Sequence, residues 1–218
     1  MNLQPSNRTN NHQQENTIKV MGEGVLSAQP NQVKITIGVK TENPSVSKAQ
    51  TENTQAINNI MSALMQMGVP QRAIQTVVYQ IEPQYDYVDG TQVFRTYLIT
   101  HLLQVELDDI SMAGAVIDQA VENGANFVSS VQFSLKDESS LQNEALTLAV
   151  HNAREKAQAI ANSLSVPMKS LPIWIKELSY NDPVRFYQVA VYGASSDTSI
   201  QPGLIEIRAQ IEALFEFG

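Results

Sequence analysis

Hydrophobic and polar residues alternate along two stretches of this chain. In residues 33–39, Val and Ile alternate with Lys, Thr and Gly, and residues 205–217 repeat the same period of two over a longer run. This period places every second side chain on one face of a β-strand, so both stretches are predicted to be strands with one buried face. A segment around residues 18–28 is expected to pair with residues 33–39 through a turn at residues 29–31.

Three other stretches repeat apolar residues at the spacing of an amphipathic helix. The first is predicted to be capped by Asn43, to carry the following proline in its first turn and to end at Gly68. The second is predicted to follow a capping Asp108 or Asp109. The third and longest runs from about residue 138 to residue 164, with a stripe of Ala, Leu and Ile along one side.

A long β-hairpin is predicted between the first two helices. Asp89-Gly90 is a typical sequence for its turn. Tyr79, Tyr85 and Tyr87 share one face of the first arm if no bulge intervenes, and Tyr97 lies across the hairpin. Because aromatic side chains combine a large contact area with a polar tip, these four tyrosines are the candidate ligand-binding or interface residues. Ordinary core packing is the alternative.

Further strands are predicted at residues 126–135, 171–180 and 185–192, with a turn at 181–183 and a flexible loop around Gly193 to Ser196. Hairpins therefore dominate the connections. The predicted fold is α+β, with antiparallel β-sheets built from hairpins and three helices packed on one face. The polar residues 1–16 are predicted to be a disordered tail, and residues 17–218 to form the α+β domain.

Charge and segment composition bear on partners and location. The 218 residues include 14 Lys and Arg against 22 Asp and Glu, a formal charge of −8, which argues against nucleic acid and anionic lipid as partners. Residues 1–16 contain no apolar run of the kind a secretory signal needs, and no stretch of the chain has the length and apolar composition of a membrane span. A cytoplasmic location is therefore predicted, with an exported location as the alternative.

The residues that carry chemistry do not form a recognisable catalytic pattern. The chain has no cysteine, and His12, His101 and His151 are isolated from one another, so no catalytic residue, metal site or cofactor is expected. Gly22-Glu23-Gly24 lacks the third glycine of a dinucleotide fingerprint and is expected to permit a bulge or a close backbone approach. Asp108-Asp109 is interpreted as a helix cap rather than a carboxylate dyad.

Ordered landmarks extend over residues 18–217. They include Gly22-Glu23-Gly24, Ile74-Gln75-Thr76, Tyr85-Asp86-Tyr87, Gly124-Ala125-Asn126 and Ala153-Arg154. In the order and spacing of these landmarks the chain resembles the SIMPL-domain family, the YggE-like bacterial stress-defence and envelope proteins. The resemblance implies an α+β domain, self-association into oligomers, links to oxidative-stress tolerance and no established catalytic residues.

Three functional hypotheses follow. The first is a protein that is not an enzyme and acts as a homo-oligomer and through contacts with an unidentified protein partner, using exposed strands such as the tyrosine-rich hairpin and the final strand. The alternative is a small-ligand-binding protein or cryptic hydrolase with a cleft beside Tyr85, Tyr87 and Tyr97. The third, scavenging of oxidants by the seven methionines, competes with core packing of the methionines at positions 61, 65 and 67.

Overall fold

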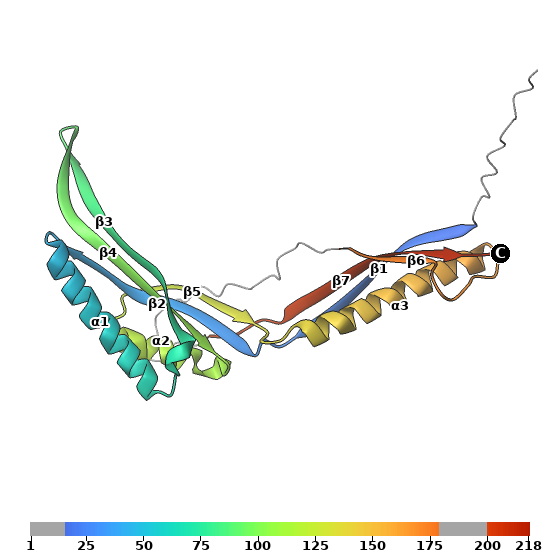
Figure 1. The fold of residues 1–218 in the computed structure, drawn as a ribbon, viewed down its shortest axis with the longest axis horizontal. Helices are drawn as coiled ribbons and strands as arrows, with labels where there is room; N and C mark the ends of the chain where they lie inside the picture. The colour runs from blue at the N-terminus through green and yellow to red at the C-terminus, as the bar shows by residue number, and fades with distance from the viewer. Residues whose placement is uncertain (1–15, 179–199) are drawn as a thin grey trace, which may run out of the picture. The chain divides into compact units, whose positions relative to one another are not determined.

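The computed structural model describes residues 16–178 and 200–218, and its helices and strands form the expected α+β architecture (Figure 1). The described part of the chain separates into two compact units, each assembled from segments that are distant in sequence. The first unit contains α3, β6 and most of β1 and β7, and the second contains β2 to β5 with α1 and α2. The predicted polar tail (except Asn16), the strand at 185–192, the turn at 181–183 and the loop at 193–196 lie outside the described residues.

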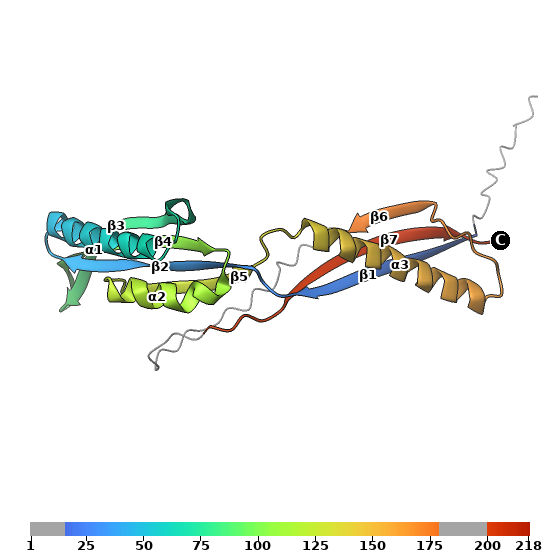
Figure 2. The ribbon, with the colours of Figure 1, turned by 90° about the horizontal axis from the view of Figure 1, so that it is seen from below.

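The second unit is a four-stranded sheet with strand order β3-β4-β2-β5. Helices α1 and α2 pack against this sheet and against each other (Figure 2). Side chains with no exposed surface from β2, β4 and the two helices form its core, among them Ile35, Ile37, Val105, Ile60 and Val116. The elements are β2 (Gln32–Asn43), α1 (Val46–Gln66), β3 (Ile74–Val88), β4 (Thr91–Leu107), α2 (Ala113–Glu122) and β5 (Phe127–Ser134).

The predicted pairing of the first two strands is wrong. In the described residues, β2 lies between β4 and β5 and pairs antiparallel with both, from Val33↔Leu107 and from Gln32↔Ser134. Residues 29–31, predicted as the turn, are instead hydrogen-bonded through Asn31 to the end of β5. The Asn31 N–H donates to the Ser134 carbonyl at 3.1 Å, and Asn31 Oδ1 accepts from the Lys136 N–H at 2.8 Å. Alternation identifies a half-buried strand but does not identify the partner strand.

The predicted starts of the first two helices have different outcomes. Asn43 does not cap α1, because its Oδ1 accepts from the Ser45 N–H at 2.9 Å in a turn before the helix, and Ser45 is the capping residue. The proline after Asn43 therefore precedes the helix. Asp109 does act as a cap, since its Oδ1 accepts from the Ser111 N–H at 3.0 Å at the start of a short 3₁₀ helix (Ile110–Met112) that leads into α2.

The first unit contains β1 (Thr17–Ala28), α3 (Ser139–Ser163), β6 (Trp174–Leu178) and β7 (Ile205–Glu216), with strand order β1-β7-β6. The final strand is not the predicted edge strand, because β7 lies between β1 and β6 and pairs with β6 over residues 210–214. Figure 2 shows α3 running beside this sheet. Its fully buried residues are all alanines, whereas Leu148, Ile160 and Leu164 of the predicted apolar stripe are exposed. The buried alanines are Ala145, Ala149, Ala153, Ala157 and Ala161.

Small side chains let α3 approach β1 closely. A Cβ atom built on Gly24 would lie 1.9 Å from the Ala145 carbonyl oxygen, and one on Gly22 would lie 2.0 Å from the Ala149 carbonyl oxygen. No side chain fits at such separations, so both positions require glycine. The expectation that these glycines permit a close backbone approach is confirmed.

Candidate functional site

The tyrosine-rich hairpin forms as predicted, with irregularities that alter its register. Asp89 and Gly90 form the turn with φ of 50° and 78°, as a tight hairpin turn requires. Register shifts occur between Thr76 and Val78 on β3 and near Tyr85, where β4 has one extra residue. Beyond the second shift, Tyr85 lies opposite Phe94.

The structure brings together aromatic side chains from both arms of the hairpin. The rings of Tyr85 and Phe94 have centroids 6.0 Å apart with an edge-to-face geometry, and those of Phe94 and Tyr97 are 5.0 Å apart. Farther from the turn, the centroids of the Tyr79 and His101 rings lie 5.0 Å apart in an edge-to-face geometry. Gln50 of α1 donates to the Tyr79 hydroxyl at 3.4 Å. We call the set Tyr79, Ile81, Tyr85, Tyr87, Phe94 and Tyr97 the aromatic hairpin face.

Most of the aromatic hairpin face is accessible to solvent. Tyr87 is 75% exposed, Tyr85 46% and Phe94 42%, whereas Ile99 farther along the same arm is completely buried. The face is therefore continuous with the core at one end and uncovered near the turn. Single exposed apolar residues are ordinary on protein surfaces, but a contiguous patch of aromatic side chains is typical of an interaction surface.

Sequence reasoning identified the tyrosines but missed Phe94. The signal was present, because a two-residue turn at Asp89-Gly90 fixes the register and places Phe94 directly opposite Tyr85. The contact between Phe94 and Tyr97 depends on the bulge, which no pattern in the sequence indicates.

His101 lies on β4 beside the aromatic hairpin face. Its Nε2 atom is 3.2 Å from the Thr76 hydroxyl, and partial burial lowers the pKa of His101 below its usual value of 6.5. The imidazole is therefore mainly neutral at pH 7. Its polar and aromatic neighbours, Thr76 and Tyr79, are uncharged partners for that neutral ring.

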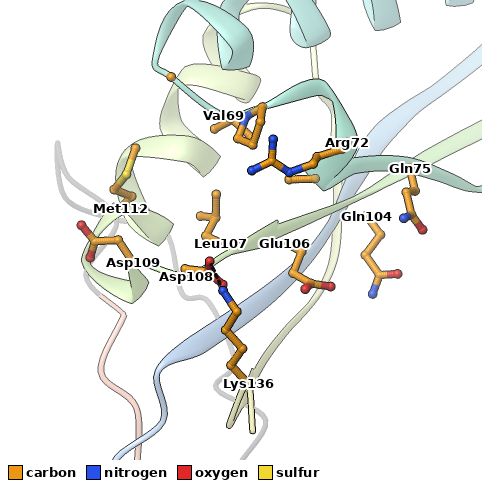
Figure 3. Close-up of a pocket in the computed structure, with 13 residues that line it drawn as sticks. Val69, Arg72, Gln75, Gln104, Glu106, Leu107, Asp108, Asp109, Met112 and Lys136 are labelled. Atoms are coloured by element: carbon orange, nitrogen blue, oxygen red, sulfur yellow. Dashed lines mark hydrogen bonds and ion pairs between the residues drawn. The ribbon is translucent and has the colours of Figure 1, made fainter.

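A cavity of about 430 Å³ lies at the other end of the hairpin, where β3 begins and β4 ends (Figure 3). None of the four candidate tyrosines lines it, so it is separate from the cleft predicted beside Tyr85, Tyr87 and Tyr97. The charged side chains that line it are Arg72, Glu106, Asp108, Asp109 and Lys136.

A hydrogen-bonded network fixes two of the carboxylates at this cavity. Gln32 is 7% exposed and donates through Nε2 to Glu106 at 2.9 Å and to Asp108 at 3.5 Å, while the Ser134 hydroxyl donates to Gln32 Oε1 at 3.2 Å. The Lys136 ammonium lies 2.6 Å from Asp108 Oδ2. Hydrogen bonding by Lys136 and then by Gln32 lowers the pKa of Asp108, so this carboxylate is ionised at neutral pH.

Asp109 plays a different part from its neighbour. Its Oδ1 accepts from both the hydroxyl and the N–H of Ser111, at 2.6 and 3.0 Å, and these bonds lower the pKa of Asp109. Asp108 and Asp109 therefore have separate partners and do not share a proton, so the interpretation as a helix cap rather than a dyad is confirmed for Asp109. Among the residues that the structure describes, no group of three or more His, Asp or Glu side chains has the arrangement of a metal site.

Comparisons with known proteins agree with this fold. A family model, SIMPL, described as a protein of unknown function (DUF541), matches residues 18–215. The chain is 28% identical over 167 residues to the 26 kDa periplasmic immunogenic protein of Brucella melitensis, covering 74% of this chain and 66% of that protein, just under two thirds of its length. It is 20% identical over 202 residues to the uncharacterized protein YggE of Escherichia coli K12, covering 91% of this chain and 82% of YggE.

The predicted cytoplasmic location is contradicted by this comparison, because the Brucella relative is named as a periplasmic protein. The prediction rested on residues 1–16 alone, whereas the match to the Brucella protein covers 74% of the chain. No helix in the described residues is both long enough and apolar enough to span a membrane.

Proposed function

This chain belongs to the SIMPL family, and we propose that it is a non-enzymatic protein that assembles with further copies of itself through the aromatic hairpin face. The observation that carries the proposal is the uncovered row of aromatic side chains on the β3–β4 hairpin, from Tyr79 to the 75%-exposed Tyr87. Burial of such side chains between protein surfaces is strongly favourable because it removes large apolar areas from water.

The proposed contact is face to face rather than edge to edge. β3 is an edge strand of its sheet, and an open edge is a template for pairing with another strand. Pro83 lies in the middle of β3, however, and proline has no N–H to donate to a neighbouring strand. A continuous ladder along this edge would therefore be interrupted, whereas the aromatic side chains are free to pack against a second face.

The size of the face indicates a moderate affinity. The exposed parts of Tyr79, Tyr85, Tyr87 and Phe94 amount to about 400 Å² when a full aromatic side chain offers about 200 Å². Two copies would bury about 800 Å² from these rings, and neighbouring side chains would have to contribute the remainder of the roughly 1,200 Å² in a small specific interface. We therefore expect dissociation constants in the micromolar range.

The engaged state of the acidic groups supports the non-enzymatic part of the proposal. Asp108 is held by Lys136, Asp109 by Ser111, and His101 is neighboured by Thr76 and Tyr79. The contacts of Asp108 and Asp109 are an ion pair and a helix cap, and neither pairs a nucleophile with a base that activates it. The Thr76–His101 contact does place a hydroxyl against an imidazole, so it does not support this part of the proposal.

Sedimentation velocity of the full chain, from about 1 to 100 μM, tests the assembly. We expect the sedimentation coefficient to rise with concentration, and the double variant Tyr85→Lys, Tyr87→Lys to remain monomeric because two charged groups would be placed in the contact. The matched control is Gln80→Lys, Gln84→Lys, which adds the same charge to the opposite face of β3. A chain that is monomeric throughout, or a control that dissociates as readily as the tyrosine variant, would contradict the proposal.

We also propose an exported location and a role in oxidative or envelope stress defence. The first is supported by the periplasmic name of the Brucella relative. The second rests only on the resemblance to the YggE-like stress-defence proteins, because the matching family model is described as a protein of unknown function. Osmotic-shock fractionation of bacteria that express the natural full-length gene tests the location, since an exported protein is released with the periplasmic fraction. Recovery only with the cytoplasmic fraction would refute it.

A further inference from the structure

Among the described residues, no carboxylate lies within ion-pair distance of the Arg72 guanidinium group, although its charge acts at longer range on Asp108 and, with the hydrogen bond from Lys136, contributes to the lowered pKa of that carboxyl. Glu106, by contrast, lies 3.4 Å from the Lys34 ammonium, and Asp108 lies 2.6 Å from that of Lys136. Figure 3 shows the Arg72 guanidinium group over the cavity, beside Val69 and Leu107. The cavity therefore presents a planar cation whose hydrogen-bonding groups are available to a ligand.

The backbone that carries Arg72 is well fixed. Arg72 lies in a 3₁₀ helix (Gln71–Ala73), in which the Ala73 N–H donates to the Pro70 carbonyl at 2.8 Å. The preceding turn contains Gly68 with φ of +92°, and the Val69 N–H donates to the Leu64 carbonyl at 3.1 Å at the end of α1. A fixed backbone reduces the conformational entropy lost when the guanidinium group binds a partner.

Two of the three carboxylates around the cavity are paired with a lysine, which reduces their repulsion of an anion. Lys34 and Lys136 balance the charges of Glu106 and Asp108, and Asp109 accepts two hydrogen bonds from Ser111. Asp109 keeps its negative charge, so a ligand carboxylate would have to bind through direct contact with the Arg72 guanidinium group and not through the overall charge of the cavity. Arginine binds carboxylates through two parallel hydrogen bonds, which is the strongest polar contact this cavity offers.

The remaining walls favour a short apolar body on the ligand. Val69, Pro70, Ala73, Leu107 and Met112 line the cavity beside Arg72. We propose that the cavity binds a small organic acid, with its carboxylate on the Arg72 guanidinium group and its aliphatic part against Val69, Leu107 and Met112. The volume of about 430 Å³ falls within the roughly 300–1,000 Å³ typical of small-ligand sites.

Two sources share this chemistry: a free aliphatic acid and the C-terminal residue of a peptide. Amide NMR titration of the full chain with sodium hexanoate, sodium phosphate and N-acetyl-alanyl-leucine, at constant ionic strength, tests both. We expect saturable shifts in residues 69–73 and 107–112 for the acids, with dissociation constants of about 1–10 mM. Tighter binding of hexanoate would assign the site to free acids, and tighter binding of the dipeptide would assign it to peptide termini.

Neutral and mutant controls decide whether Arg72 carries the binding. Hexanamide has the same shape without the charge, and we expect it to bind at least about tenfold more weakly than hexanoate. Arg72→Gln should weaken hexanoate binding to a similar degree, whereas Arg95→Gln, which removes an arginine from the hairpin, should not change it. Equal binding of hexanamide or of phosphate, unchanged binding by Arg72→Gln, or no saturable shift would overturn the proposal.

Discussion

The close approach of α3 to β1 predicts that Gly24→Ala is strongly destabilising. The added Cβ atom would lie 1.9 Å from the Ala145 carbonyl oxygen and 2.8 Å from the Ala149 amide nitrogen. Both are backbone atoms of one helix, so no side-chain rotation relieves the clash. An ordinary contact needs at least 3.4 Å, which means that helix and strand must separate by about 1.5 Å at this point.

The cost of that separation follows from the alanine stripe. Ala145 and Ala149 are completely buried, and a gap of this size removes much of the dispersion energy of their contacts with the sheet. Overpacking a well-filled interior usually costs about 1–3 kcal/mol. Because the clash involves backbone on both sides, we expect a loss near 3 kcal/mol in the free energy of unfolding, at the upper end of that range.

Urea denaturation followed by circular dichroism measures the loss, with Gly68→Ala as the matched control. Gly68 also has a backbone conformation that favours glycine, with φ of +92°, but a Cβ atom added there would have no atom within 4 Å beyond its own chain neighbours. The control should lose only about 1 kcal/mol from backbone strain. If Gly24→Ala unfolds at the same urea concentration as Gly68→Ala, the close packing of α3 on β1 is refuted.

Two further predictions concern polar groups of the second unit. Burial lowers the pKa of His101 in the folded state, so the unfolded chain binds more protons below about pH 6.5, and the free energy of unfolding should fall as the pH drops through 6.5 toward the lower folded pKa. His101→Gln should flatten this dependence in urea titrations between about pH 7 and 5. An unchanged slope would contradict the prediction. Asn53 is 1% exposed and donates to the Val39 carbonyl at 3.3 Å and the Thr41 hydroxyl at 3.1 Å, so Asn53→Ala should lower the free energy of unfolding by about 1–3 kcal/mol. Asn58 is exposed, and Asn58→Ala should change it by no more than about 0.5 kcal/mol in the same urea assay. Equal losses would refute the role of these hydrogen bonds.

The local elements could be predicted from the sequence, but their partners could not. The Asp89-Gly90 turn and the cap at Asp109 depend on residues close in sequence, and both form as predicted. The pairing of β1 with β7 joins residues almost 200 positions apart, which no local pattern records. The five buried alanines of α3 recur every four residues and belong to the predicted apolar stripe, whereas the exposure of its larger residues follows from the close approach of the helix to the sheet, which helical periodicity does not record.

The candidate sites were predictable to different degrees. The tyrosines on β3 share a face because β3 alternates regularly beyond its bulge, and that alternation is visible in the sequence. The cavity at Arg72 joins residues from α1's end, the start of β3, the end of β4 and the segment after β5. Sequence spacing gives no indication that Arg72 and Lys136 line one cavity, because only the paired strands bring them together.

The central claim is that copies of this chain meet through the aromatic hairpin face, and a single spin label tests it directly. The chain has no cysteine, so Gln92→Cys places one nitroxide opposite Tyr87, and Asn58→Cys places a control label on α1. Pulsed dipolar spectroscopy should show a shorter distance between copies for the label at position 92 than for the control, and the coupling should vanish when Tyr85→Lys and Tyr87→Lys are added. Absence of coupling at position 92, or coupling that persists in the lysine variant, would contradict the claim.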